Sequence, residues 1–423
     1  MRYRIAMISD FFYPRVGGVE NHILNISKEL RQLGHTIIII THSNTGLVGV
    51  QEVLGFKTYY LDLLSIFGGA VFPTFFCTAA PIARILLNEQ IDIVHGHQCT
   101  TLALEGVFHA RMLGLAVCFT NHSLVQVNTL GGALTATAFQ LSMLDAHQII
   151  CVSQASRINT AARLNIDPEK IAVIPNAVTD DFIPSPTALK PTPAIIITIA
   201  VVSRLTFRKG AVLLAETLPT ICQLDERIRF IIAGDGDKRD LLEHTVDAHQ
   251  LHTRVSFLGN INSNQVQQVL TKADLFLNTS LTDAFCISIV EAAACGLYVV
   301  STNVDGISEV LPTHMITLTP ATPAGIITGI KTALPKIAKY NKLISHQTVR
   351  ALYRWPDIAQ KTNNIYHQIY KQDRSSPRQK LTKSAQEMYR LRKHLFSPSF
   401  LLVFLLNYLS LFLLTLVYET PFR

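Results

Sequence analysis

The chain has 423 residues, of which 48% are hydrophobic and 16% charged. At about 150 residues per domain this length predicts two or three domains, and so apolar a composition excludes a disordered or fibrous chain and suggests a membrane. Eight Lys/Arg and two Asp/Glu in residues 371–394 supply +6 of the net charge of +7, so the basicity belongs to one segment and does not indicate nucleic-acid binding. The seven cysteines are an odd number scattered without a CxxC pair, so they support neither a disulfide framework nor a zinc site, and reduced thiols facing the cytosol are predicted.

The first half of the chain alternates short apolar runs with segments of helical period. The run Arg4–Ile8 leads into a loop with Gly17 and Gly18, and a helix is predicted over residues 20–33, closed by Gly34. Continuous apolar runs of this kind are typical of parallel strands covered on both faces, so this half predicts a doubly wound α/β domain. Further strands are predicted at residues 36–41, 91–95, 116–120 and 148–152.

A proline-rich stretch, residues 175–193, interrupts this alternation and is the predicted domain boundary. The alternation then restarts and predicts a second Rossmann-like domain. Two such domains facing each other across a cleft would bind ligands at the carboxyl ends of both sheets. The strands of the second half are predicted at residues 194–202, 229–233, 255–258, 275–278, 298–301 and 315–318.

Candidate phosphate-binding residues follow the first strand of each half. Gly17 and Gly18 let the backbone approach a ligand closely, and free N–H groups at a helix start attract phosphate. A tight turn without any ligand is the alternative. Arg204 and Lys209 suit a diphosphate, because Arg binds two oxygens at once and Lys acts as a point charge. A solvated charged loop fits these two cations as well.

Two acidic residues are the strongest candidates for binding a sugar. Asp283 lies in a polar loop, and Glu291 lies in a predicted helix rich in Val, Ala and Cys. A carboxylate accepts several hydrogen bonds and therefore suits the vicinal hydroxyls of a sugar or ribose. In a tightly packed helix it is costly without a partner. A surface salt bridge is the alternative interpretation.

Three histidines, His95, His97 and His122, lie near predicted strand ends. The His-x-His spacing is compatible with a metal, but no carboxylate or cysteine lies at a matching short spacing. We therefore expect no metal and no cofactor. A hydrogen-bonding role in the cleft is favoured, with His122 best placed.

Two apolar segments suggest membrane contact. Residues 395–418 are 24 uncharged residues, and a helix of this length spans about 36 Å at ~1.5 Å per residue, enough to cross a bilayer. Since the basic segment precedes it, the positive-inside rule predicts a single-pass anchor with the rest of the chain cytosolic. A buried helix is the alternative. Residues 63–83 are also uncharged, and Phe72, Phe75 and Phe76 are predicted to dip into the membrane surface, unless this is an ordinary buried segment.

The order of the motifs resembles that of the retaining GT-B glycosyltransferases of family four, over about residues 3–370. Within that family the similarity is to catalytic subunits of the type that makes N-acetylglucosaminyl-phosphatidylinositol. The motifs are GGVENHILNISKELRQLGH, HGHQ, FTNHSL, CVSQASRINT, VIPNAV, VVSRLTFRKG, AGDGDKRDLLE and the stretch from Asn278 to Pro312.

This resemblance implies transfer of GlcNAc from UDP-GlcNAc to phosphatidylinositol with retention and without a metal. That reaction is the first step of glycosylphosphatidylinositol-anchor synthesis, on the cytosolic face of the endoplasmic reticulum membrane. The resemblance also implies that other subunits join the chain in a complex. Alternatives are another lipid-acceptor glycosyltransferase, such as a phosphatidylinositol mannosyltransferase, and an inactive scaffold that binds a nucleotide sugar.

The resemblance also implies residue roles. Arg204, Lys209 and the Gly17–Gly18 loop bind the donor diphosphate, and Glu291 holds the ribose. Asp283 contacts the transferred sugar, where the family usually has Glu, so its reach is shorter by one methylene. His122 lies near the reacting centre. The acceptor side is assigned to His97, Phe72, Phe75 and Phe76.

The predicted organisation has six parts. An acceptor-side Rossmann-like domain and a nucleotide-sugar domain are joined by a linker and are followed by closing helices, the basic juxtamembrane segment and the transmembrane helix. Their predicted bounds are 1–180, 181–193, 194–345, 346–370, 371–394 and 395–418, with the linker second and the nucleotide-sugar domain third.

Overall fold

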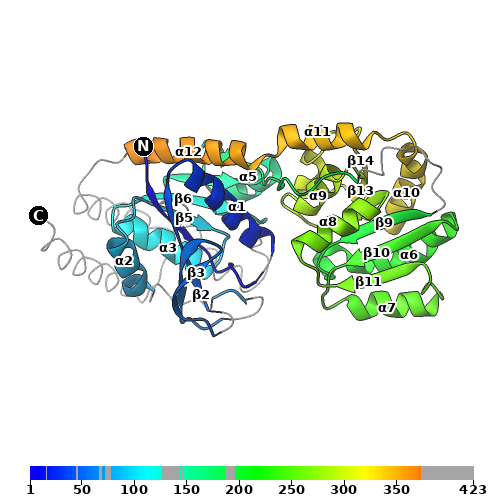
Figure 1. The fold of residues 1–423 in the computed structure, drawn as a ribbon, viewed down its shortest axis with the longest axis horizontal. Coiled ribbons are helices and arrows are strands. Elements are labelled where there is room, and N and C mark those ends of the chain that lie inside the picture. The colour runs from blue at the N-terminus through cyan, green and yellow to red at the C-terminus, as the bar shows by residue number, and fades with distance from the viewer. Residues whose placement is uncertain are drawn as a thin grey trace, which may run out of the picture. The chain divides into compact units, whose positions relative to one another are not determined.

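The computed structural model divides the chain into two compact units (Figure 1). The N-terminal unit comprises Met1–Ile174 and the described residues from Pro356 onward, and the C-terminal unit comprises Pro175–Trp355. The structure describes residues 1–15, 17–43, 46–65, 69–71, 78–125, 143, 146–185 and 196–372.

The N-terminal unit is built on an eight-stranded sheet with the order β3-β4-β2-β1-β5-β6-β7-β8. All its strand pairs are parallel except β3 with β4. The central strands are almost fully buried, as the continuous apolar runs predict. The strands are β1 Arg4–Ile8, β2 Thr36–His42, β3 Gly49–Val53, β4 Phe56–Leu61, β5 Ile93–His97, β6 Ala116–Asn121, β7 Gln148–Cys151 and β8 Ile171–Val173.

Helices join successive strands of this sheet. Helix α1 begins at Gly18, and Gly34, with φ +95°, follows it at the turn into β2, as the sequence predicts. Helix α3 packs against β5 and β6, and α5 packs against β7 and β8. The helices are α1 Gly18–Gln32, α2 Ala79–Asn88, α3 Thr101–Met112 and α5 Gln154–Leu164, with a short 3-10 turn, η2, at Pro168–Lys170.

A long helix, α12 (Trp355–Gln372), returns the chain to the N-terminal unit (Figure 1). Buried hydrogen bonds fix it there. The hydroxyl of Tyr366 lies 2.6 Å from Nδ1 of His95, and Asn363 Oδ1 lies 3.0 Å from Nε2 of His35. The Tyr3 hydroxyl meets Nδ1 of His367 at 2.8 Å. The last described helix is therefore part of the N-terminal core, although it is remote in sequence.

The C-terminal unit holds a six-stranded, all-parallel sheet with the order β11-β10-β9-β12-β13-β14. Each of its strands coincides with a predicted run to within three residues at either end. The strands are β9 Ile197–Val202, β10 Ile228–Ala233, β11 Val255–Gly259, β12 Leu275–Asn278, β13 Tyr298–Thr302 and β14 Ile316–Thr319.

Helices pack on this sheet and on one another: α10 contacts α6 and β13, and α11 contacts α9. Each of the two units therefore has the doubly wound arrangement that the sequence predicts. The helices are α6 Ala211–Leu224, α7 Arg239–Ala248, α8 Ser263–Lys272, α9 Ile287–Ala294, α10 Pro323–Ile337 and α11 Lys342–Leu352, with 3-10 turns η4 at Phe207–Lys209 and η5 at Asp305–Glu309.

The membrane predictions fall mostly on residues that the structure does not describe. The segment 395–418, the basic segment beyond residue 372, and Phe72, Phe75 and Phe76 all lie outside the described residues. Within the described part of the chain, no helix has both the length and the apolarity to cross a bilayer.

Candidate functional site

Two loops of the C-terminal unit are tied together at the carboxyl ends of β9 and β12. The Leu281 N–H donates to the Arg208 carbonyl at 2.9 Å, and the Thr279 hydroxyl donates to the Gly210 carbonyl at 3.0 Å. Gly210 has φ +72°, and a Cβ there would lie 1.7 Å from the Thr279 carbonyl oxygen. Only glycine lets the loops approach this closely, so the sequence RKG is matched to this junction.

The junction brings Lys209 and Asp283 together. Lys209 Nζ lies 2.6 Å from Asp283 Oδ2, and the side chains are 26% and 13% exposed. Burial disfavours the charged form of both groups. For Lys209 the interaction with the Asp283 carboxylate is larger than this effect of burial, so the pKa of the ammonium is raised. The same pairing lowers the pKa of Asp283 in spite of its burial. Both groups are therefore charged at neutral pH.

The second oxygen of Asp283 is held by the start of helix α9. Its Oδ1 accepts the backbone N–H groups of Phe285 at 3.3 Å and Cys286 at 3.1 Å. Cys286 takes a left-handed conformation, φ +59°, immediately before the helix. Burial raises the pKa of the Cys286 thiol to about 12, so it stays protonated beside Asp283. These contacts fix the carboxylate in one orientation.

Glu291 lies in helix α9 and is partly buried. Among the described residues, its carboxylate has no hydrogen-bond or ion-pair partner. Burial raises the pKa of Glu291 to about 7. The salt bridge considered as an alternative for this residue is not formed, whereas Asp283 does form one. A carboxylate kept ready for a ligand hydroxyl has these properties.

Arg204 follows β9 and is exposed, unlike Lys209. It is near enough for its charge to oppose protonation of Lys209. The structure therefore places Arg204, Lys209, Asp283 and Glu291 in the same unit, with contact between Lys209 and Asp283. Their roles toward a donor stay predictions.

The glycine pair lies where the sequence predicts, with Gly17 capping helix α1 and Gly18 as its first residue. Gly17 is extended, with φ −168°, so its backbone does not require glycine. A Cβ on Gly17 would lie 2.7 Å from Glu20 Oε2, whereas a Cβ on Gly18 would meet nothing within 4 Å. The Glu20 carboxylate thus lies beside the helix start that we predict to bind phosphate.

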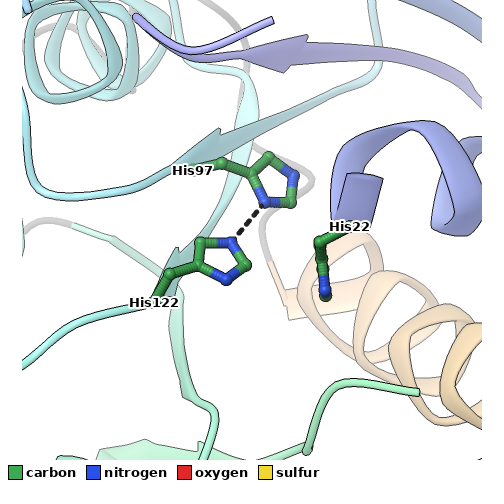
Figure 2. A group of neighbouring side chains, drawn as sticks. All are labelled: His22, His97 and His122. Carbon is green, nitrogen blue, oxygen red and sulfur yellow. Dashed lines mark hydrogen bonds between the residues drawn. The ribbon is translucent and has the colours of Figure 1, made fainter. Parts of the chain in front are cut away.

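Histidines lie together at the carboxyl ends of the central strands β5 and β6 of the N-terminal unit (Figure 2). His97 ends β5 and is buried, and its Nδ1 lies 3.2 Å from Nε2 of His122, which follows β6. His22 of helix α1 lies across from this pair, its ring centroid 4.5 Å from that of His122. Burial, together with the neighbouring histidines, lowers the pKa of His97 and of His122 well below the ordinary value.

His95 anchors this group from behind. Its Nδ1 faces the Tyr366 hydroxyl at 2.6 Å and its Nε2 faces the Thr120 hydroxyl at 2.7 Å. Gly96 is required between the two histidines for space, because a Cβ there would lie 2.6 Å from Val107 of helix α3. Burial lowers the pKa of His95 to about 3, so it is neutral.

Two elements of this site were not found from the sequence. His22 lies far from the other histidines along the chain, and its only signal is its position one helical turn after Gly18, on the same helix face. The Lys209–Asp283 pair joins two candidates that were considered separately, because only the fold brings the loops together.

Comparison with known proteins gives the class of the protein first. Residues 16–182 match the family model Glycosyltransferase Family 4, and residues 185–344 match Glycosyl transferases group 1. The fold is also that of the Anabaena protein HepE, solved in complex with UDP, with a TM-score of 0.70, 19% identity, and 86% of this chain and 100% of that one covered. Two Rossmann-like units of this kind define a GT-B glycosyltransferase.

Curated relatives narrow the class to one family. A phosphatidylinositol N-acetylglucosaminyltransferase subunit from Arabidopsis thaliana is 41% identical over 372 residues, 88% of this chain and 83% of the relative. The Homo sapiens protein of the same name is 40% identical over 374 residues, 87% and 76% of the two chains. The gpi3 subunit of the Schizosaccharomyces pombe transferase is 38% identical over 368 residues, 86% and 80% of the two chains. The chain belongs to this family of phosphatidylinositol N-acetylglucosaminyltransferase subunits.

Proposed function

We propose that this protein transfers GlcNAc from UDP-GlcNAc to phosphatidylinositol, the first step of glycosylphosphatidylinositol-anchor synthesis. The observation that carries this proposal is the identity of about 40% with these transferase subunits over most of their length. The site is compatible with it, because the C-terminal unit offers two cations for a diphosphate and two carboxylates for hydroxyl groups.

The proposed transfer retains the anomeric configuration and uses no metal at the diphosphate. Departure of UDP leaves negative charge on the phosphates, which Arg204 and Lys209 stabilise together with backbone N–H groups at Gly17 and Gly18. The ion pair with Asp283 keeps the Lys209 ammonium charged while the site is empty. Glu291 accepts from the ribose hydroxyls, and Asp283 accepts from the transferred sugar.

The proposal also includes the membrane setting. Residues 395–418 form a single-pass anchor in the endoplasmic reticulum membrane, and the enzyme works with other subunits on the cytosolic face. The uncharged sequence of this segment and the basic segment before it support that arrangement. His97, Phe72, Phe75 and Phe76 belong to the acceptor side, where phosphatidylinositol enters.

A microsomal assay with phosphatidylinositol and a donor panel of UDP-GlcNAc, UDP-Glc and GDP-Man tests the proposal. We expect product from UDP-GlcNAc only. Lys209→Ala and Glu291→Ala should each lower the transfer rate by about 10²–10³-fold, by analogy with the removal of an oxyanion-hole donor. Both variants should still reach the membrane.

Arg208→Ala is the matched control, because it removes an exposed cation from the same loop. We expect at most a few-fold loss for it. Product from GDP-Man instead of UDP-GlcNAc would refute the donor assignment. Full turnover of Lys209→Ala would refute the role of the C-terminal site. Asp283→Glu, which restores the usual family residue, should keep the rate within about tenfold of the parent, since it preserves the charge.

A further inference from the structure

The histidine group of the N-terminal unit has the composition of a metal site. His22 of α1, His97 of β5 and His122 after β6 each offer one ring nitrogen, and these three atoms lie within 4.8 Å of one another (Figure 2). The spacing of residues along the sequence did not predict a metal site here. His22, which precedes His97 by 75 residues, joins the group only in the fold.

The spacing of two of these nitrogens fits coordination. His97 Nδ1 and His122 Nε2 are 3.2 Å apart. Two imidazole ligands of a tetrahedral Zn²⁺, each about 2.0–2.1 Å from the ion, lie roughly 3.3–3.4 Å from each other. The same separation suits a hydrogen bond between the rings, so a third ligand is what distinguishes a metal site. His22 is the candidate for this third ligand, since its ring nitrogen lies within 4.8 Å of the other two.

The contacts of His97 leave its Nδ1 available as a metal ligand. Its Nε2 lies 3.4 Å from Sδ of Met7, and a proton on that nitrogen leaves the lone pair of Nδ1 directed toward His122. Burial favours the neutral imidazole, which is the form that binds metals. His95 is not a further ligand, because the Tyr366 and Thr120 hydroxyls occupy both of its nitrogens.

We propose that His22, His97 and His122 bind one divalent transition-metal cation of the Zn²⁺ class. Imidazole ligands suit Zn²⁺, Cu²⁺, Ni²⁺ and Fe²⁺, whereas Mg²⁺ and Ca²⁺ prefer oxygen. Three protein ligands leave the fourth tetrahedral position for water or an anionic oxygen. Entry is from the side of His122, which is only partly buried, while His22 and His97 are buried.

Occupation of this site affects the transferase, a consequence that rests on the proposed function. A cation on His122 withdraws that side chain from the reacting centre, so we expect Zn²⁺ to inhibit transfer and a chelator to restore it. If the cation binds and transfer continues unchanged, the metal site stands and the role assigned to His122 is wrong.

The test is a titration of the detergent-solubilised full chain with Co²⁺, followed by its visible absorption bands, and then displacement by Zn²⁺. The parent should bind one equivalent in a four-coordinate environment. His22→Ala should weaken binding by at least about 100-fold, the upper end of the loss seen when only a second-shell partner is removed. His249→Ala, on the exposed end of α7, is the control and should bind like the parent.

His22→Cys guards against a folding artefact. A thiolate at this position should restore Co²⁺ binding and add a sulfur-to-cobalt charge-transfer band, which a merely structural histidine would not produce. Failure of the parent to bind Co²⁺, or equal binding by the parent and His22→Ala, would overturn the proposal. So would a His22→Cys protein that binds Co²⁺ without the sulfur band.

Discussion

The two units differ in the charge of the side chains at the carboxyl ends of their parallel strands. In the C-terminal unit, Lys209 and Asp283 are both charged and paired at 2.6 Å, with exposed Arg204 nearby. In the N-terminal unit, His97 and His122 are held neutral by burial. In the first arrangement Lys209 and Asp283 compensate each other, so the exposed Arg204 is the charge that attracts an anion from a distance. The second arrangement recognises a ligand only through directed lone pairs and N–H groups at short range.

This difference shows how a cation that is kept for an anionic ligand can be compensated by a carboxylate while the ligand is absent. A partly buried lysine without a partner would be easier to deprotonate or would destabilise the fold, and the ion pair with Asp283 opposes both effects. The cost is that Asp283 competes with the phosphate for the same ammonium. The histidine group has no such competition, because a neutral ring carries no charge that must be compensated.

The largest expected effects come from substituting Asp283 and Lys209 one at a time. Asp283→Asn frees Lys209, so UDP affinity should rise above that of the parent, while transfer falls by about 10²-fold because the sugar contact weakens. Lys209→Met removes a charge-assisted bond worth about 1.5–3 kcal/mol and should weaken UDP binding by roughly 10- to 100-fold. Calorimetric titration with UDP and the transfer assay measure the two quantities.

Opposite directions for UDP affinity are the signature of competition within the pair. An equal loss of affinity in both variants would instead mean that the ion pair only holds the two loops together. Thermal unfolding of each variant, measured without nucleotide, distinguishes a folding defect from a binding defect.

The next effect concerns pH. Because burial raises the pKa of Glu291 to about 7 from 4.5, folding favours its protonated form. The free energy of unfolding is therefore unaffected below about pH 4.5 and falls as the pH rises from there to about 7, because over this range the unfolded chain loses the proton and the folded protein keeps it. Above the folded pKa both states are ionised and the loss is complete. The loss is at most about 3.5 kcal/mol, from ~1.4 kcal/mol for each unit of the pKa difference.

Glu291→Gln should abolish this loss. Denaturant unfolding at pH 5 and pH 8 should show a variant more stable than the parent at pH 8 and similar to it at pH 5. If ribose hydroxyls bind the carboxylate, UDP should also release protons on binding to the parent and not to the variant. Equal pH profiles of stability for the two proteins would contradict the burial of this carboxylate.

The sequence predicted most of the fold because parallel strands covered on both faces are continuous apolar runs. Strands β1 and β12 have the predicted bounds. Strand β4 was missed because Lys57 and Thr58 interrupt its apolar pattern, and β3 because it is an exposed edge strand with few apolar residues. Short β8 falls below the length at which periodicity is informative.

The candidate site was predicted residue by residue but not as an arrangement. Lys209 and Asp283 were each chosen for their chemistry, and their ion pair depends on the loop junction at Gly210, which no local pattern reveals. His22 and Tyr366 were missed for the same reason. Their partners lie on other elements, and only tertiary packing brings them to the histidines.

The smallest expected effect tests whether the histidine group depends on hydrogen bonds rather than charge. Tyr366→Phe removes the hydroxyl 2.6 Å from Nδ1 of His95 and leaves a buried polar atom unsatisfied, which costs about 1–3 kcal/mol. Tyr370→Phe, in the exposed part of the same helix, should change stability by less than about 0.5 kcal/mol. Urea unfolding of the full chain in detergent, at low and high salt, measures both. The Tyr366 effect should not depend on salt, because the groups involved are neutral; an effect that shrinks as salt rises would mean that a charged histidine contributes.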